Sequence, residues 1–234
     1  MSRADSQRDS QRDSQTDLVR VSGADTWSFL QSLLSQDVLG MEQGERRSAL
    51  MLTPQGKVEV LVGVVREGDD ALLETDSGWG ESLKTVLSRY KIRTAVEITL
   101  ESLGDQPDEM SELQRIKRGS PRMGFDLDSS VIPQEAGLEI DSVSFTKGCF
   151  VGQELVCRID SRGHVNRHLR LITNSSGATL ERGESLLQDG KVVGEVTSSA
   201  PGFALGYVRR EVEIGSNLDA SGTLVKVLER PVVK

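Results

Sequence analysis

The chain has 234 residues, with 28 lysines and arginines against 36 aspartates and glutamates, so its formal net charge is −8. This length predicts one large domain or two small ones, and two cysteines are too few for a disulfide scaffold. No apolar run approaches the roughly 18 residues of a membrane-spanning helix, no apolar segment marks secretion, and the acidic balance argues against nucleic-acid binding over the whole surface. We therefore expect a cytoplasmic globular protein with no membrane partner.

The first 16 residues repeat the tetrapeptide Asp-Ser-Gln-Arg with small changes. They contain no residue that can fill a core, so we predict a disordered tail over residues 1–16.

Residues 17–100 show alternating signals for strands and helices. Residues 18–21 predict a short strand, and Asp25 is placed to cap a helix whose apolar residues at 27, 30, 33 and 34 recur at helical spacing. Two apolar runs around Gly68 predict a β-hairpin over 58–75, followed by a helix over 80–90 and a strand over 94–100. This order predicts a small α+β sandwich.

From residue 171 onward, short apolar runs are broken by glycines, which is typical of a compact β-barrel or sandwich. We therefore divide the ordered chain into an α+β domain at 17–170 and a β domain at 171–234.

Basic residues gather between 115 and 170. Arg115, Lys117, Arg118 and Arg122 lie within eight residues of one another, and residues 147–170 carry a net charge of +3. A basic cluster in an acidic chain indicates a local anion site. Ion pairs at the surface are the alternative explanation, and the charges alone do not decide between the two.

Cys149 lies in an informative stretch. Val143 and Phe145 predict a strand and Val151 to Ile159 a helix, which would place Cys149 beside a helix N-terminus. The helix dipole and nearby Lys147 would favour the thiolate there, and hence a reactive or metal-binding thiol. The alternative is a buried cysteine that acts as a small hydrophobic residue.

Other candidates are weaker. Cys149, Cys157, His164 and His168 lack the paired spacing of a zinc site, so no zinc is predicted. A strand over 162–171 would place Arg167 with the apolar residues, as a ligand contact or a partner in a salt bridge.

The stretch from Lys147 to Glu154 resembles the signature K-G-C-Y/F-x-G-Q-E of the YgfZ/GcvT folate-binding superfamily, YgfZ branch, and Arg158 matches the arginine that usually follows. Residues 118–126 and 132–135 resemble the blocks expected before it. Residues 18–38, 52–57 and 193–198 resemble the usual opening, hairpin and C-terminal barrel.

The resemblance implies ferredoxin-like α+β folate-binding modules with a C-terminal β-barrel. It implies a role in iron–sulfur cluster assembly or repair that indirectly supports tRNA thiomodification, with iron–sulfur assembly or client proteins as partners. Tetrahydrofolate is the implied ligand. Lys147 and Cys149 would form the functional pair, with Lys147 holding the thiol deprotonated and Cys149 contacting a cluster or sulfur. The implied ligand-binding residues are Arg122, Asp126, Glu135, Gln153, Glu154, Arg158 and Arg167.

The sequence also departs from this pattern. Members usually carry a second α+β repeat where this chain has only residues 101–114, and Phe150 replaces the commoner Tyr. Aminomethyltransferases of the superfamily place a carboxylate pair where this chain has Glu59-Val60. An aminomethyltransferase and a non-catalytic interaction module without folate are therefore alternatives. The arginine run lacks the interleaved aromatic residues of an RNA-binding surface, so direct tRNA contact is left open.

Overall fold

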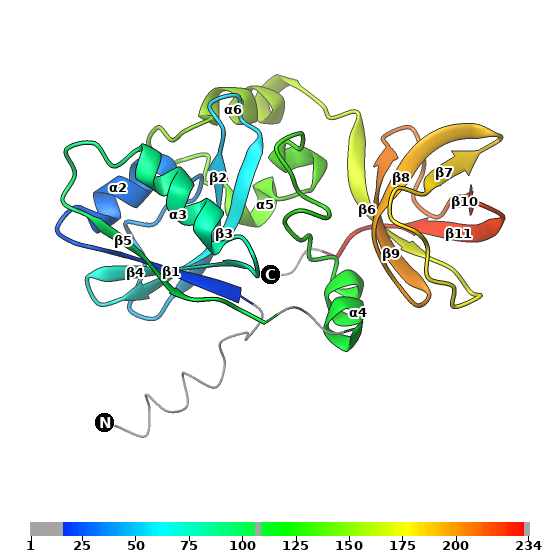
Figure 1. Cartoon of the computed structure of the whole chain (residues 1–234). Helices are drawn as coiled ribbons and strands as arrows, with labels where there is room; N and C mark the ends of the chain where they lie inside the picture. The colour runs from blue at the N-terminus through cyan, green and yellow to red at the C-terminus, as the bar shows by residue number, and fades with distance from the viewer. Residues whose placement is uncertain (1–15, 106–108, 232–234) are drawn as a thin grey trace.

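The computed structural model describes residues 16–105 and 109–231, which form an α+β body and a β-barrel side by side (Figure 1). The predicted disordered tail lies outside the described residues except for Thr16, which begins the first strand. The α+β class and the C-terminal barrel predicted from the sequence are both confirmed.

The body is built on one antiparallel sheet of five strands in the order β2-β3-β4-β1-β5. The strands are β1 (Thr16–Ser22), β2 (Arg46–Leu52), β3 (Val58–Glu67), β4 (Asp70–Asp76) and β5 (Glu97–Ser102). The predicted hairpin is β3 and β4, and β1 pairs with both β4 and β5. The first strand of the chain therefore lies inside the sheet, and β5 forms one of its edges.

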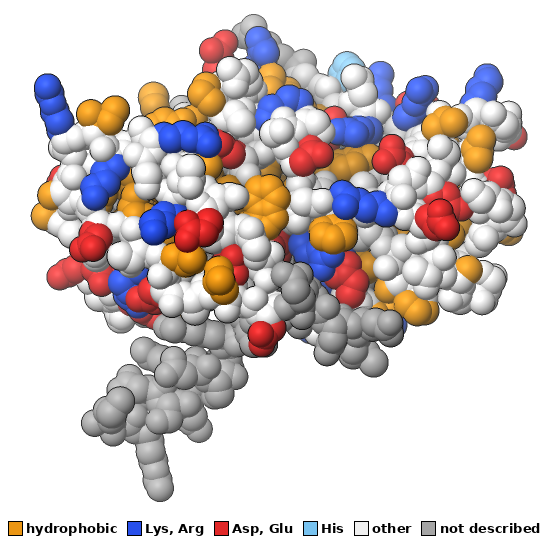
Figure 2. Space-filling view, in the orientation of Figure 1, with side chains coloured by type: hydrophobic (Ala, Val, Ile, Leu, Met, Phe, Trp, Pro, Cys, Tyr) orange, Lys and Arg blue, Asp and Glu red, His pale blue; other side chains and the backbone are white. Residues whose placement is uncertain are grey.

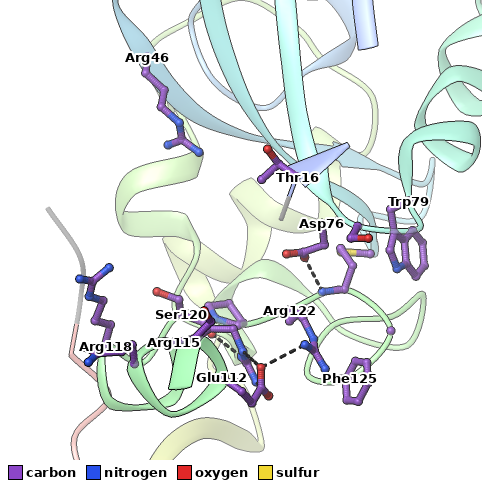
Figure 3. A pocket seen from close by; sticks show the side chains of 16 residues that line it. Thr16, Arg46, Asp76, Trp79, Glu112, Arg115, Arg118, Ser120, Arg122 and Phe125 are labelled. Atoms are coloured by element: carbon purple, nitrogen blue, oxygen red, sulfur yellow. Dashed lines mark hydrogen bonds and ion pairs between the residues drawn. The ribbon is translucent and has the colours of Figure 1, made fainter. Parts of the chain in front are cut away.

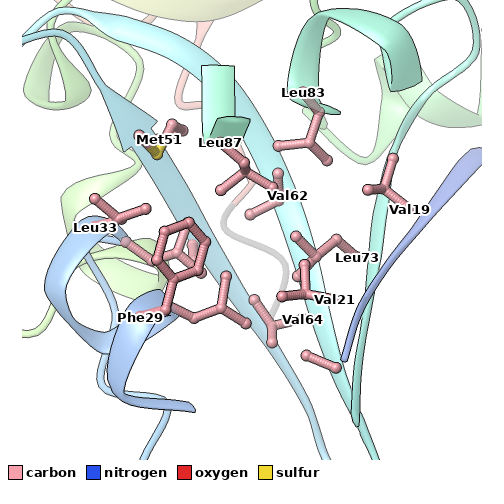
Figure 4. Packing of buried hydrophobic residues seen from close by; sticks show 14 of the residues in the cluster. Val19, Val21, Phe29, Leu33, Met51, Val62, Val64, Leu73, Leu83 and Leu87 are labelled. Carbon is pink, nitrogen blue, oxygen red and sulfur yellow. The ribbon is translucent and has the colours of Figure 1, made fainter. Parts of the chain in front are cut away.

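Two helices, α2 (Thr26–Leu33) and α3 (Gly80–Arg89), cover one face of this sheet (Figure 1). Successive strand side chains point to opposite faces, so Val62 and Val64 of β3 meet Phe29 and Leu83 from the helices in one buried cluster (Figure 4). Burying each such side chain contributes about 1.5–3 kcal/mol. This cluster holds α2 and α3 against the sheet.

The opposite face of β2 and β3 is buried as well. Leu50 and Leu52 point there and pack with Ile116 and Met123, and with Leu205 of the barrel, in a second core. The chain that crosses this face contains α4 (Glu109–Lys117), the 3₁₀ turn η2 (Pro133–Glu135), α5 (Glu139–Ser142) and α6 (Gln153–Arg162). The body and the barrel thus share one hydrophobic core.

The barrel closes in the order β10-β11-β6-β9-β8-β7. Its strands are β6 (Arg167–Thr173), β7 (Ser185–Gln188), β8 (Lys191–Ala200), β9 (Phe203–Arg209), β10 (Asn217–Ala220) and β11 (Thr223–Leu228). It encloses its own apolar cluster, which includes Leu186, Val196 and Val225. Strand β6 begins before the boundary placed between residues 170 and 171.

One local prediction is wrong, and one predicted helix begins two residues later than expected. No strand forms around Val143 and Phe145, because the Ser144 N–H donates to the Ser35 carbonyl at the end of α2. Helix α6 begins at Gln153, after Gly152 adopts a left-handed conformation with φ of 79°. A glycine suits that conformation because it lacks a Cβ.

The predicted cap on α2 is also absent, although Asp25 does occupy the N-cap position. Its carboxylate makes no capping hydrogen bond and accepts the Ala95 N–H at 2.7 Å, which ties the helix start to the segment before β5.

Candidate functional site

A cavity of about 600 Å³ lies where the end of β4 faces the segment between residues 111 and 125 (Figure 3). Its volume is in the range that holds a small organic ligand, about 300–1,000 Å³. Four arginines line it, Arg46, Arg115, Arg118 and Arg122, against the carboxylates of Asp76 and Glu112. The basic cluster predicted from the sequence therefore forms part of a cavity wall.

Arg115, near the end of α4, is held by two carboxylates, one from α4 and one from the segment that follows it. It donates to Glu112 at 2.6 Å and to Asp126 at 2.8 Å. Burial by itself would lower the pKa of Arg115, but these two acceptors raise it overall. Its charge is thus neutralised within the protein, and its role is to support the wall.

Arg122 is less completely satisfied. Its Nη1 donates to Glu112 at 3.0 Å, and its guanidinium lies 3.7 Å from the centre of the Phe125 ring (Figure 3). Burial lowers the pKa of Arg122, and its buried Nε has no hydrogen-bond partner in the described part of the chain. A buried donor without a partner costs about 1–3 kcal/mol, so an acceptor that reached this atom would be favoured.

Arg118 is exposed at the end of the cavity away from Trp79, and it makes no ion pair with the described residues. It is the cation of this wall that is most accessible to an anionic ligand.

Asp76 and Trp79 form the opposite side of the cavity (Figure 3). The Asp76 Oδ2 accepts the Met123 N–H at 2.8 Å. Burial raises the pKa of Asp76, which favours its protonated form. The sequence analysis missed this residue because Asp76, Ser77 and Gly78 look like an ordinary turn. The detectable signal is a carboxylate placed directly between an apolar strand and a tryptophan.

Asp126, a predicted ligand-binding residue, is buried behind this wall. One carboxylate oxygen accepts from Arg115 and from the Arg122 N–H, and the other accepts from the hydroxyls of Thr197 and Ser198 in β8. With both oxygens occupied, Asp126 connects the cavity wall to the barrel.

Lys147, which the resemblance pairs with Cys149, directs its ammonium to backbone carbonyls. Its Nζ donates to the carbonyls of Gln31, Leu34 and Gln36 at 2.7, 2.6 and 2.9 Å. These carbonyls lie at the C-terminal end of α2, where free acceptors attract a cation. Burial lowers the pKa of Lys147 to about 8. Lys147 thus ties the Cys149 loop to α2, while the Cys149 side chain is exposed.

The other predicted ligand-binding residues lie outside the cavity lining. Glu135 and Arg167 pair with each other at 3.0 Å, and Arg167 stacks 4.4 Å from the centre of the Tyr207 ring. Gln153, Glu154 and Arg158 lie on α6, where Glu154 and Arg158 are exposed. Of the predicted site residues, Arg122 alone lines this cavity.

Glu59, the carboxylate at the place of the aminomethyltransferase pair, does not line this cavity. It accepts from Arg89 of α3 at 2.7 Å. Within residues 16–105 and 109–231, no group of three histidine, cysteine or acidic side chains is arranged to hold a metal ion. Among the described residues, none of the helices could span a lipid bilayer.

One face of the molecule shows basic, acidic and apolar side chains interspersed, with no single type covering it (Figure 2). A continuous basic surface of the kind that follows a nucleic-acid backbone is therefore not visible on that face.

The comparisons with known proteins agree with this architecture. Residues 167–232 match the family model of the CAF17 C-terminal beta-barrel domain. The tRNA-modifying protein YgfZ of Serratia proteamaculans is 27% identical over 204 residues, covering 80% of this chain and 58% of the relative. The tRNA-modifying protein YgfZ of Escherichia coli is 34% identical over 132 residues, covering 53% of this chain and 38% of the relative. The chain thus matches about two fifths to three fifths of the length of these relatives.

Among solved structures, the glycine cleavage system aminomethyltransferase T from Bartonella henselae superposes with a TM-score of 0.81 at 16% identity, covering 93% of this chain and 84% of that one. The fold is therefore that of the GcvT-like proteins, an α+β body with a C-terminal barrel. Together with the family model and the YgfZ relatives, it makes the chain similar to the YgfZ/GcvT-like proteins.

Proposed function

We propose that the chain is a cytoplasmic, folate-dependent accessory protein in iron–sulfur cluster assembly or repair, which indirectly supports tRNA thiomodification. The relatives named as tRNA-modifying proteins support the proposed link to tRNA modification. Iron–sulfur assembly or client proteins are its proposed partners. The observation that carries the folate part is the arginine-lined cavity with an unpaired buried donor at Arg122 Nε.

The residues of the cavity fit tetrahydrofolate. Trp79 offers a ring face for a flat heterocycle, and the Asp76 carboxyl is an acceptor for its N–H groups. Arg118 and the free Nε of Arg122 suit the carboxylates of the glutamyl part. When bound, tetrahydrofolate supplies a carrier for one-carbon groups. The protein's own residues bind and orient it, while Asp126 fixes the wall. Glu135, Arg167 and the α6 side chains have no ligand contact in this proposal.

Cys149 is the proposed contact to a cluster or to sulfur. Its exposed side chain lies on a loop anchored through Lys147, so a partner protein can reach the thiol without unfolding the body. Because the described residues offer no ligand group of three, a cluster would be held mainly by the partner, with Cys149 as a shared ligand.

A calorimetric titration under reducing, anaerobic conditions tests the folate part. We expect saturable binding of tetrahydrofolate, weakened about tenfold in Arg118→Gln through loss of one charge-assisted contact. The matched control is Arg210→Gln, an exposed arginine of the barrel side, which should leave the affinity unchanged. The absence of saturable binding to the folded wild-type protein would refute this part of the proposal.

Complementation tests the cysteine. In cells that lack the protein, Cys149→Ser should fail to restore the activity of iron–sulfur enzymes, whereas the half-buried Cys157→Ser should restore it. Full rescue by Cys149→Ser at equal protein level would show that this thiol has no role.

A further inference from the structure

A second cavity, of about 450 Å³, adjoins the first. Arg46, Ser120 and Pro121 line both cavities, so these three residues form a common wall. The second cavity extends from that wall towards Gln36, whose carbonyl accepts the Lys147 ammonium. A ligand in the first cavity therefore has a further binding space next to it.

Arg230 is the buried cation of this second cavity. Only 8% of the residue is exposed, and its Nη1 and Nη2 donate to the carbonyls of Gly119 and Gly137 at 2.8 and 3.1 Å. Burial lowers the pKa of Arg230, against the opposing effect of the nearby carboxylates of Asp141 and Glu139, neither of which forms an ion pair with it. A guanidinium has five N–H donors, so Arg230 retains donors for an anion.

The remaining charges of the lining favour an anion as well. Arg46 and Arg47 line the cavity with Arg230, whereas Asp141 is its one acidic residue within the described chain. Arg46 uses its Nε to bond Glu74 at 2.7 Å and makes no hydrogen bond from its terminal nitrogens to the described residues. It can therefore contact a ligand while it is paired to Glu74.

The same cavity has an apolar side formed by Leu61, Pro121 and Leu138. An inorganic anion would leave this surface without a partner. A molecule that joins a carboxylate to a short carbon chain would use both sides, because guanidinium groups match planar carboxylates and the chain would cover the apolar surface.

We propose that the second cavity binds an organic carboxylate, with the anionic group on Arg230 and Arg46 and the carbon chain against Leu61 and Leu138. The carboxylate belongs either to additional glutamates on a folate in the first cavity or to a separate small acid. The first of these sources rests on the proposed function, and the second does not.

The test is a calorimetric comparison of monoglutamyl tetrahydrofolate, triglutamyl tetrahydrofolate and the free dipeptide γ-glutamylglutamate. The main variant is Gln36→Glu, which places a carboxylate of nearly the same shape in the cavity wall and loses one hydrogen bond, from the Gln36 amide to the Asp141 carbonyl. Arg230→Gln is the second variant, used if it folds, because it also loses bonds to two carbonyls. Gln188→Glu in β7 adds the same charge to the barrel and serves as the control.

If the glutamyl tail occupies the cavity, triglutamyl folate should bind about tenfold more tightly than the monoglutamyl form, and Gln36→Glu should abolish this preference. If a separate acid occupies it, the dipeptide should bind alone, and Gln36→Glu should weaken that binding about tenfold. Gln188→Glu should change neither result.

Equal affinities of the two folates together with no dipeptide binding would overturn the inference. A failure of monoglutamyl folate to bind would instead refute the proposed function, and the dipeptide titration would then decide the inference by itself.

Discussion

The substitution Asp126→Ala should destabilise the protein, because Asp126 connects the cavity wall to the barrel. Asp126 is 2% exposed and accepts hydrogen bonds from Arg115 at 2.8 Å, from the Arg122 N–H at 3.0 Å and from the Ser198 hydroxyl at 2.8 Å, besides the Thr197 hydroxyl. Alanine removes all four acceptor contacts and takes away one of the two carboxylates that neutralise Arg115. Breaking a buried ion pair on one side costs about 3–5 kcal/mol.

For a protein of this size, each kcal/mol lowers the melting temperature by about 2–4 °C. Asp126→Ala should therefore melt about 6–20 °C below the wild type in a calorimetric scan. Asp126→Asn keeps one oxygen acceptor and should lose less. The exposed Asp128 gives the matched control, since its carboxylate is hydrogen-bonded to nearby Ser130 and does not reach the barrel. If Asp126→Ala melts within a degree or two of Asp128→Ala, the assigned role of Asp126 is wrong.

Three further predictions follow from the body. Gly152→Ala should cost about 2 kcal/mol or more in urea denaturation, because φ is 79° and the new Cβ would lie 2.5 Å from the Thr53 carbonyl; a loss no larger than that of Gly190→Ala, where φ is 74° and nothing lies within 4 Å, would disprove the clash. Lys147→Met should lower the free energy of unfolding by about 1–3 kcal/mol, since three carbonyls lose a donor, and an unchanged melting temperature would contradict it. Burial raises the pKa of Asp76 above 3.8, so its protonated native form is stabilised below about pH 3.8 and this stabilisation is lost as the pH rises through the folded-state pKa. The free energy of unfolding of the wild type, relative to that of Asp76→Asn, should therefore be lower at pH 7 than at pH 4. A difference that does not change with pH would show that burial does not shift the pKa of Asp76.

Local periodicity predicted most elements of the body, because the strands and helices around the first core have regular apolar faces. Phe29 and Leu83, for example, stand at helical positions of amphipathic segments. The segment between residues 103 and 166 was harder, since its structure depends on contacts far along the chain. Ser144 bonds to Ser35, and Lys147 to the end of α2, so the local preference for a strand was overridden.

The candidate site shows the same limit. The cluster of arginines predicted an anion site, and Arg122 does line the cavity. Charge alone did not separate Arg115, which two carboxylates neutralise, from Arg118, which is exposed. Asp76 was missed because only the folded sheet brings the end of β4 opposite residues 111–125. The spacing of charges in a sequence contains no information on such pairing.

Tryptophan fluorescence tests the central claim most directly, because Trp79 lines the cavity and Trp27, which lies against Arg66, does not. In the variant Trp27→Phe, the remaining tryptophan is Trp79. Tetrahydrofolate should quench its emission, and the dissociation constant from this titration should equal the one from calorimetry. Quenching should be lost in Trp79→Phe when its binding is confirmed by calorimetry. Saturable binding that leaves Trp79 unquenched would place the folate elsewhere and contradict the account.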